Sequence, residues 1–471
     1  MSELITSTER ALAERLAASI GAITGPENVL SGDAVEEFRW DALGPWRGFP
    51  EYDALSPQPL VVARPRTTEE VSEIVQLAAQ RGIAIVPYGG GSGLMGGAIA
   101  LRPSVVIELK RMDSIFEIDS ENLTVRVQAG VILETLEQAL NRDGLILGHD
   151  PWSLPIATVG GAISTDSLGY RGAKYGSMGE QVLGLTAVLP DGSIFDRTTP
   201  AKTSVGPDLR RLFIGSEGCF GIVTETKLRV FQQPELRSMR AYRFRHFEDG
   251  FAAIAEMHGI GLAPALLDYG EHPGDGAEPT PATLYLGFEG FREEVGAQKR
   301  RARLICTKAG GRSVGRGEAK AFWKRRHDIA IGFAERRRQG GSRPSPAGGA
   351  FDFIHVTLPR SRVLGFRAAS TALLERHAVR AVEYGIWCWP ELFSVTMTAD
   401  GADAREHLSG AVDELLSLAR DKGGSIEYCH GVGVRLAHLM EREHGHGLEV
   451  MRSIKRALDP EGILNPGKLG L

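Results

Sequence analysis

The sequence predicts an α+β protein of about two domains, in which strands and helices alternate along the chain. Its 471 residues are enough for more than one domain and a large hydrophobic core. Three glycine-rich stretches within residues 55–232 each lie between segments with strand character. Residues 233–424 continue to alternate strand and helix patterns, but they lack such glycine-rich stretches. We therefore expect two regions of different construction.

Composition and charge exclude several classes of function. Hydrophobic residues make up 42% and charged residues 24%, which is ordinary for a soluble globular protein. The formal net charge of -5 favours neither a nucleic acid nor an anionic membrane as partner. The first 25 residues do not resemble a signal peptide, and no run approaches the roughly 20 apolar residues of a membrane span. Four widely separated cysteines form no C-x-x-C pair, so we expect reduced thiols in a cytoplasmic protein.

The first glycine-rich stretch is VPYGGGSGLMGG, residues 86–97, and within it residues 91–96 match G-x-G-x-x-G. A dinucleotide fingerprint of this kind must open a helix. The segment before it fits, because Thr67 and Glu70 form a capping box that starts a helix and IAIV follows as a strand. The segment after it does not fit, because Pro103 prevents a long helix and SVVIEL predicts another strand. We therefore expect a loop whose backbone N–H groups wrap an anion.

Two further stretches have similar character. Residues 149–195 contain Gly160 and Gly161, which allow close approach of a ligand, and a polar run from Ser164 to Ser167. A strand, VLGLTAVL, and an Asp-Gly hairpin turn follow. Residues 212–230 place three glycines around Glu217 ahead of a strand that alternates in polarity.

The order and spacing of these stretches resemble the vanillyl-alcohol oxidase type of FAD-binding proteins, which have the PCMH-type fold. Members include D-lactate and glycolate dehydrogenases and alkylglycerone-phosphate synthases. The resemblance is carried by ARPRTTEEVSEIVQLA, VPYGGGSGLMGG, DPWSLPIATVGGAISTDSLGYRGAKYG, VLGLTAVLPDG, LFIGSEGCFGIVTE and, near the end of the chain, HGVG with MRSIKRALDPEGILNPGK. These segments cover most of residues 55–232 and 425–471.

The resemblance implies a two-part FAD-binding domain over residues 1–232, an α+β cap that supplies the substrate pocket over 233–424, and a segment that returns to the FAD domain over 425–471. It implies that the glycine run wraps the diphosphate, that a group from Thr158 to Ser167 lines the flavin, and that Glu217 and Ile222 meet the adenosine or ribose end. The cofactor-binding residues implied in full are Pro87, Tyr88, Gly89, Gly90, Gly91, Ser92, Gly93, Leu94, Pro151, Thr158, Gly160, Gly161, Ser164, Ser167, Gly169, Tyr170, Glu217, Gly221, Ile222 and Asn465. Because GGGSGLMGG contains no histidine, we expect FAD to be held non-covalently.

Three residues are candidates for catalysis. His430 precedes G-x-G at the position where hydroxyacid dehydrogenases of this family have a pocket histidine, so it is the first candidate for general base. Tyr428 lies next to it. Arg326, in AFWKRRHDI, resembles the family arginine that binds a substrate carboxylate through a bidentate fork. Packing residues remain the alternative at each position.

The sequence also departs from the metal-dependent members. They have a glutamate immediately before the last histidine, where this chain has Cys429, and a histidine-rich cap segment, where it has EYGIWCWPELFSVTM. We therefore expect no catalytic metal. Trp387 and Trp389 alternate along a predicted strand and share one face, either in the cap core or as the wall of a pocket for an apolar substrate. Residues 336–343 form a predicted arginine-rich loop, for which simple solvation is favoured over a gate for an anionic substrate.

The leading hypothesis is an FAD-dependent oxidoreductase that oxidises a C–OH group of a small organic substrate, a hydroxy acid or an aromatic alcohol, by hydride transfer to flavin N5. Electrons would then pass to oxygen or to a redox partner, and a homodimer is an allowed assembly. One alternative is a flavin-dependent transferase of the alkylglycerone-phosphate synthase kind, although only one of the family's consecutive histidines is present. The other is a flavoprotein without turnover of its own.

Overall fold

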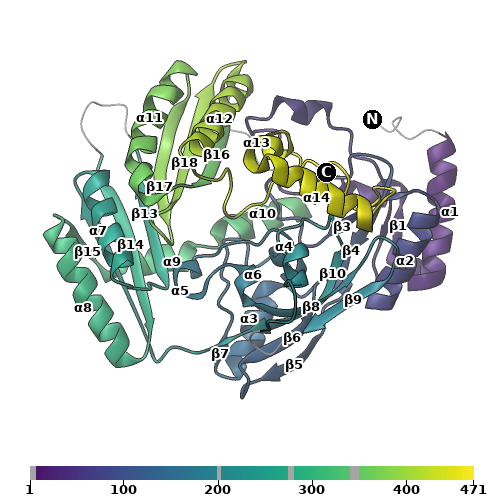
Figure 1. Ribbon diagram of the computed structural model, residues 1–471, viewed down its shortest axis with the longest axis horizontal. Coiled ribbons are helices and arrows are strands. Elements are labelled where there is room, and N and C mark those ends of the chain that lie inside the picture. Colours follow the sequence, from purple (N-terminus) through teal and green to yellow (C-terminus); the bar gives the residue numbers. More distant parts are fainter. Residues whose placement is uncertain (1–6, 199–202, 274–279, 340–348) are drawn as a thin grey trace.

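The computed structural model describes residues 7–198, 203–273, 280–339 and 349–471. Three sheets and a short two-stranded ribbon account for the described strands. Figure 1 shows the largest sheet with its helices on the left, the two smaller sheets on the right and below, and the yellow C-terminal helices between them. The arrangement confirms the predicted mixed helix and sheet architecture.

The first small sheet has the order β1-β2-β4-β3 and is parallel from β2 to β3. Helix α2 (Thr68–Gln80) makes the crossover between β2 and β3, and the Thr67 hydroxyl accepts a hydrogen bond from the Glu70 N–H, as the capping box predicts. After β3 the chain runs through the glycine loop into β4 without a helix, so the G-x-G-x-x-G match is not a Rossmann motif. The bounds are β1 (Val29–Ser31), β2 (Pro59–Ala63), β3 (Ala84–Tyr88) and β4 (Ser104–Glu108), and α1 (Ser7–Thr24) packs beside β1 and β2.

The second small sheet is antiparallel, with the order β5-β6-β10-β8-β9. Its strands are β5 (Ile115–Asp119), β6 (Thr124–Gln128), β8 (Val182–Val188), β9 (Ile194–Thr198) and β10 (Ile222–Arg229). The predicted Asp191–Gly192 turn joins β8 and β9. The helices here are α3 (Leu133–Arg142), α4 (Val159–Ser164), α5 (Gly172–Tyr175) and α6 (Met178–Gln181), and β7 (Leu145–Ile146) pairs with β11 (Phe231–Gln232).

The large antiparallel sheet has the order β15-β12-β14-β13-β17-β18-β16. Two successive β-α-β-β-α units build it, the first from β12 to α8 and the second from β16 to α12. The strands are β12 (Leu236–Phe244), β13 (Leu266–Glu271), β14 (Ala282–Gly290), β15 (Arg312–Gly315), β16 (Gly349–Thr357), β17 (Arg380–Trp387) and β18 (Leu392–Asp400). The helices are α7 (Phe247–Gly259), α8 (Arg292–Lys308), α11 (Val363–Arg376) and α12 (Ala404–Asp421), with α9 (Arg316–Arg325) and α10 (Asp328–Arg338) between the units.

One face of this large sheet is buried under helices and the other faces the smaller sheets. Ile354, Val356, Ile386 and Val395 point to the helices and belong to the largest hydrophobic core. Because side chains alternate along a strand, the opposite face carries Phe353, His355, Trp387 and Ser394. We call this second face the inner face of the cap sheet, and it faces the glycine loops.

The C-terminal segment connects the large sheet to the first small sheet. Ser425 and Glu427 form isolated bridges with Thr357 and His355 of β16, at the edge of the large sheet. The chain then passes through α13 (Met440–His444) and α14 (His446–Leu458), and Leu464 pairs in parallel with Ile85 of β3. The domain boundaries proposed at residues 232 and 424 remain a prediction.

Two local predictions differ from the structure. Residues 336–338 are not part of a loop but form the last turn of α10, while Arg343 lies outside the described residues. Strand β17 ends at Trp387, and Cys388 has a positive φ of 57°, so the chain turns and Trp389 does not continue the strand. None of the helices in the described ranges has the length and apolar character needed to cross a membrane.

Candidate functional site

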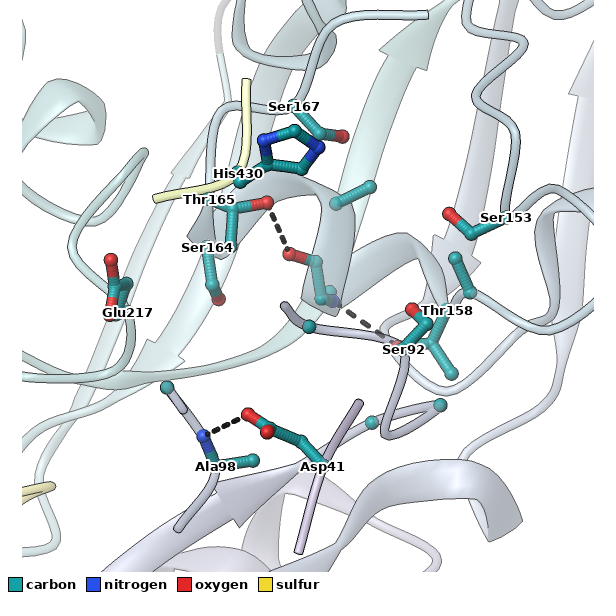
Figure 2. Close-up of a pocket in the computed structure, with 18 of the residues that line it drawn as sticks. Asp41, Ser92, Ala98, Ser153, Thr158, Ser164, Thr165, Ser167, Glu217 and His430 are labelled. Atoms are coloured by element: carbon teal, nitrogen blue, oxygen red, sulfur yellow. Dashed lines mark hydrogen bonds between the residues drawn. The ribbon is translucent and has the colours of Figure 1, made fainter. Parts of the chain in front are cut away.

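A large cavity lies between the glycine loops and the inner face of the cap sheet. It contains about 1330 Å³ of space not filled by atoms, part of it open to solvent. Figure 2 shows the labelled wall residues around one hollow, with His430 at the end nearest Ser167 and Asp41 at the opposite end. Its wall joins residues of all three glycine-rich stretches with residues of the cap side, as expected where a cofactor and a substrate share one cavity.

The first glycine loop forms a large part of the wall. All eight residues that the sequence singled out here line the cavity: Pro87, Tyr88, Gly89, Gly90, Gly91, Ser92, Gly93 and Leu94. Glycine is required sterically, because a Cβ atom at Gly90 would lie 2.0 Å from the carbonyl oxygen of Ile156. Within the described part of the chain, no acceptor takes a hydrogen bond from the N–H groups of residues 90–97. Such a row of unpaired donors fits an anionic diphosphate.

The second stretch forms the opposite wall through the short helix α4. The Thr158 hydroxyl caps this helix by accepting from the Gly161 N–H at 3.2 Å, and Gly160 packs so closely on Ala129 that a Cβ atom would lie 2.7 Å from it. Six predicted residues of this stretch line the cavity: Pro151, Thr158, Gly160, Gly161, Ser164 and Ser167. Gly169 and Tyr170 do not. Gly169 packs on the Asp150 backbone, and the Tyr170 ring stacks on Trp387 with ring centroids 5.5 Å apart.

The third stretch contributes Glu217, Gly221 and Ile222 to the wall, but the carboxylate of Glu217 already has partners within the protein. It accepts hydrogen bonds from the N–H groups of Val432 and Gly433 in the C-terminal segment. Burial raises the pKa of Glu217 to about 7, although these N–H donors oppose the shift. Glu217 therefore holds the C-terminal segment in place.

Asn465 plays a similar part and does not line the cavity. Its side-chain amide donates to the carbonyl oxygens of Gly97 and Glu217, at 2.8 and 2.6 Å. It thus ties the first and third loops together instead of contacting a ligand. A residue that sequence reasoning missed, Asp41, lies in the wall opposite, where its carboxylate accepts from the N–H groups of Leu43 and Ala98.

On the cap side, side chains from three separate segments converge. His355 from β16 and Trp387 from β17 line the cavity together with Cys429 and His430. The imidazole rings of His355 and His430 have centroids 4.5 Å apart and meet edge to face. Burial, with help from the nearby His430, lowers the pKa of His355 to about 3, so this ring is neutral near pH 7. Its Nδ1 is buried and has no hydrogen-bond partner among the described residues.

The carboxylate of Glu427 fixes the backbone of this cluster and lies beside His430. Its Oε1 accepts from the N–H groups of Tyr428, Cys429 and His430 at 2.9, 2.9 and 3.1 Å, and lies 3.5 Å from Nδ1 of His430. Burial opposes ionisation, but the positive charge that His430 can carry and these donors together lower the pKa of Glu427 to about 2. The carboxylate is therefore ionised and orients His430.

The cluster also bears on the predicted absence of a metal. Ligand atoms of His355, Glu427, Cys429 and His430 lie within 4.8 Å of one another, whereas the sequence argument counted only the last two. These are ligand types that zinc accepts. Against a metal, Oε1 of Glu427 already accepts three N–H groups, and burial raises the pKa of the Cys429 thiol well above its usual range. The absence of a catalytic metal stays a prediction.

Three other predicted residues lie outside the cavity wall. The Nε of Arg326 donates to Oδ2 of Asp150 at 3.0 Å, and its guanidinium lies 3.9 Å from the Trp323 ring centroid. The Tyr428 ring meets His355 edge to face at 5.3 Å, and its buried hydroxyl has no hydrogen-bond partner in the described part of the chain. Trp389 packs beside Leu168 behind the wall. The structure therefore does not bring Arg326 to the cavity, and the expected shared face of Trp387 and Trp389 is wrong.

The wall also contains residues that the sequence did not single out. Among them are two apolar residues, Trp152 and Leu168, and one imidazole, His355. Trp152 and Leu168 fall within the second glycine-rich stretch, so attention to its apolar residues could have found them. His355 had no local signal, because its segment predicts only a half-buried strand.

Comparisons with known proteins agree with this geometry. A family model described as an FAD binding domain matches residues 59–197, and one described as the C-terminal domain of FAD linked oxidases matches residues 234–469. The chain is 32% identical over 463 residues to the glycolate oxidase subunit GlcD of Bacillus subtilis (strain 168), covering 95% of each. It is 29% identical over 467 residues to a D-lactate dehydrogenase of Anaerostipes hadrus, covering 94% of this chain and 95% of the relative.

Solved structures show the same fold. An alkyldihydroxyacetonephosphate synthase superposes with a TM-score of 0.78 at 19% identity, over 97% of this chain and 86% of that one. A p-cresol methylhydroxylase superposes with a TM-score of 0.76 at 18% identity, over 100% and 98% of the two chains. The unpaired N–H groups of the glycine loop fit the diphosphate that such a cofactor carries. The chain therefore belongs to the family of FAD-linked oxidoreductases, with FAD as its cofactor.

Proposed function

We propose that the protein oxidises a C–OH group of a small organic substrate, a hydroxy acid or an aromatic alcohol, with His430 as the general base. One observation carries this proposal. His430 lines the same cavity as the glycine loops, and the ionised Glu427 lies 3.5 Å from its Nδ1. A carboxylate on one ring nitrogen orients the imidazole and stabilises the imidazolium that forms when the other nitrogen takes a proton.

In this proposal the hydride passes to FAD and His430 accepts the proton. Bound FAD supplies at flavin N5 the acceptor for a hydride. Nδ1 of His430 lies 3.5 Å from Glu427, and Nε2, which has the Cys429 sulfur at 3.6 Å, is the nitrogen that would receive the proton of the substrate hydroxyl. As the substrate C–H bond breaks with its electron pair leaving as hydride, the O–H proton passes to Nε2 and the carbon becomes a carbonyl. The two electrons leave the protein through oxygen or through a redox partner.

Anaerobic flavin reduction tests this proposal directly. The FAD-loaded protein is mixed without oxygen with hydroxy acids and with benzylic alcohols, while the flavin absorbance is followed. Bleaching by one of these compounds supports the oxidoreductase. Conversion of a substrate without any net electron acceptor would point to a transferase instead. A flavin that stays oxidised with every compound would leave only a binding role.

A matched pair of variants tests His430. We expect His430→Ala to retain FAD and to reduce the rate of flavin reduction by at least about a hundredfold, because loss of a general base costs this much or more. Tyr428→Phe is the control, since the Tyr428 hydroxyl does not line the cavity, and it should lose much less. Near-normal reduction by FAD-replete His430→Ala would remove His430 from the mechanism.

The attachment of FAD has its own test. The loop GGGSGLMGG offers no histidine for a covalent bond, so we propose that FAD is released intact by acid or heat denaturation. Flavin that stays with the precipitated chain would overturn this proposal without affecting the rest.

A further inference from the structure

The cap side of the cavity combines an indole with two imidazoles and a thiol, and its described residues include no arginine or lysine. Along the described part of the cavity wall there is no lysine and no arginine. The apolar groups nearest the His355–His430 pair include the indole of Trp387, and Trp152 and Leu168 add further apolar surface. A wall of this kind suits the hydrocarbon part of a ligand.

The cations closest to this wall are bound elsewhere. Arg47 and Arg435 are both buried and share Asp352, with Nε of Arg47 at 2.5 Å from Oδ1 and Nη2 of Arg435 at 3.4 Å from Oδ2. The Phe353 ring lies on the guanidinium of Arg47 at 3.9 Å, and its centroid is 5.3 Å from the ring centroids of both His355 and His430. Phe353 thus separates these charges from the pair of histidines.

Arg326 and Arg337 are occupied as well. Arg326 donates to Asp150 and to the carbonyl oxygen of Trp323. Arg337 contacts the hydroxyl of Tyr88 and the carbonyl oxygen of Gly91, both on the first glycine loop and away from the cap. Neither guanidinium is free to form the bidentate fork that a substrate carboxylate requires.

The charge that does lie beside the pair of histidines is negative. Glu427 is ionised and 3.5 Å from His430. The described wall offers a substrate carboxylate no lysine or arginine, and the His430 imidazole that the carboxylate could approach already faces the carboxylate of Glu427. Burying an unpaired charge costs several kcal/mol.

A neutral hydroxyl meets the opposite situation. His355 is a neutral imidazole at the wall, and its buried Nδ1 has no hydrogen-bond partner among the described residues, so it can form one hydrogen bond with a neutral polar group. Trp387 is held in place by its stack on Tyr170 and by an edge-to-face contact with His355 at 6.1 Å. It therefore presents a fixed aromatic surface to whatever enters.

We infer that the substrate is a neutral alcohol with an aromatic or otherwise apolar body, and not an anionic 2-hydroxy acid. This inference rests on the proposed function and names the class of substrate for the same site. His355 positions the hydroxyl group and Trp387 packs against the body. The relatives named for glycolate and lactate therefore differ from this protein in substrate charge.

The test compares ligands that differ only in the carboxylate. FAD-loaded protein is mixed anaerobically with mandelate or with methyl mandelate, which share the same ring and the same hydroxyl carbon, and flavin reduction is followed. We expect the ester to have a second-order rate constant at least about a hundredfold higher, because the acid must bury its charge unpaired. A higher rate constant for mandelate would overturn the inference and leave the oxidoreductase intact.

A binding experiment decides the inference even if neither compound reduces the flavin. Benzamide and benzoate are titrated separately into the oxidised holoprotein, and the perturbation of the flavin spectrum gives each dissociation constant. Tighter binding of benzamide supports a neutral substrate, and tighter binding of benzoate overturns it. If the flavin stays oxidised with both mandelate compounds, with other hydroxy acids and with benzylic alcohols, the proposed function fails separately.

A charge-adding variant sharpens the result. Trp387→Arg places a guanidinium at the cavity wall, where it can stack on Tyr170, and Trp387→Phe keeps an aromatic ring there. The ratio of the rate constants for mandelate and methyl mandelate should rise at least about tenfold in Trp387→Arg and stay near the wild-type value in Trp387→Phe. An unchanged ratio in a FAD-replete Trp387→Arg protein would contradict the role of charge at this wall.

Discussion

The two walls of the cavity are built from different materials. On the cofactor side the wall is mostly backbone, where glycines let chain segments approach so closely that a single Cβ atom would collide with a neighbour. On the cap side the wall is made of side chains from β16, β17 and the C-terminal segment, namely His355, Trp387, Cys429 and His430. The cofactor wall therefore fits one ligand shape and tolerates few substitutions. Substitutions of side chains on the cap wall can change which substrate binds without moving the backbone.

The largest expected effect is on the cofactor wall. In Gly90→Ala the new Cβ atom would lie 2.0 Å from the carbonyl oxygen of Ile156, so the loop must shift and its N–H groups lose their arrangement. We expect the purified variant to contain almost no FAD and to bind added FAD at least about a hundredfold more weakly. Fluorescence titration of the apoprotein with FAD measures this.

Gly93→Ala is the matched control in the same loop. Its Cβ atom would meet nothing closer than Oδ2 of Asp41 at 3.4 Å, and its φ is not in the left-handed region. It should keep FAD binding within about tenfold of wild type. Wild-type affinity in Gly90→Ala would show that the cofactor wall tolerates side chains after all, and would remove the contrast between the walls.

The next effect is on the cap wall. His355→Ala should fold and retain FAD, yet reduce its flavin with a neutral alcohol about 10- to 100-fold more slowly, because the substrate hydroxyl loses a hydrogen-bond partner. Thr357→Ala, two residues along the same face of β16 and away from the cavity, is the control. Stopped-flow reduction of both holoproteins decides the matter. A loss of FAD from His355→Ala at unchanged reduction rate would assign His355 to the cofactor wall instead.

A smaller effect concerns the junction of the two walls, where Glu217 binds the C-terminal segment. The folded protein keeps a proton on Glu217 up to about pH 7, while the unfolded chain releases it near pH 4.5. The unfolded state thus binds fewer protons between these values, so the unfolding free energy falls as pH rises through this range and is constant above it. The loss amounts to about 3 kcal/mol.

Guanidinium unfolding at pH 5 and pH 8 measures this difference. Glu217→Gln should show a smaller decline than wild type between the two values, with the remainder coming from other buried carboxyls of raised pKa such as Asp41, whereas Glu51→Gln, a change at an exposed glutamate, should keep the full decline. Equal pH dependence in wild type and Glu217→Gln would show that another group is responsible.

The smallest kinetic effect is expected for Arg326. Because its guanidinium is bound by Asp150 and does not line the cavity, Arg326→Ala should change flavin reduction by less than about threefold and lower stability by about 1–3 kcal/mol. Arg325→Ala, an exposed neighbour, should change neither. If Arg326→Ala lost activity toward hydroxy acids but kept it toward neutral alcohols, Arg326 would again be a candidate for binding the substrate carboxylate.

The contrast between the walls also explains what the sequence could predict. The glycine loops are local, so the steric demand for glycine at Gly90 and Gly160 and the strands on either side are visible in one short stretch. The helix that starts after Thr67 and the hairpin at Asp191 and Gly192 follow from equally local signals. All of these lie where the sequence predicts them.

The cap wall depends on pairing between distant segments. His355 meets Glu427 only because residues 425–427 return to the edge of the large sheet beside β16. The signal that could have found this is the repeated β-α-β-β-α order: in the first unit β15 follows α8 and pairs with β12, so a segment after α12 should pair with β16. Trp389 failed for a local reason, because the positive φ of Cys388 ends the strand one residue earlier. The prediction that Arg326 binds substrate missed the cavity because no signal in its own segment shows that Asp150 pairs with it.

The return of the chain after α12 has a consequence for how each molecule is made. Glu217 needs the N–H groups of Val432 and Gly433, and β3 needs Leu464 beside it, so the cofactor site is complete only after these late residues are synthesised. FAD capture is therefore one of the last events in the maturation of each polypeptide. A chain whose translation stops before residue 425 would present a free strand edge at β3 and a buried carboxylate without its donors. Such products should be targets for chaperones and proteases and should carry no flavin.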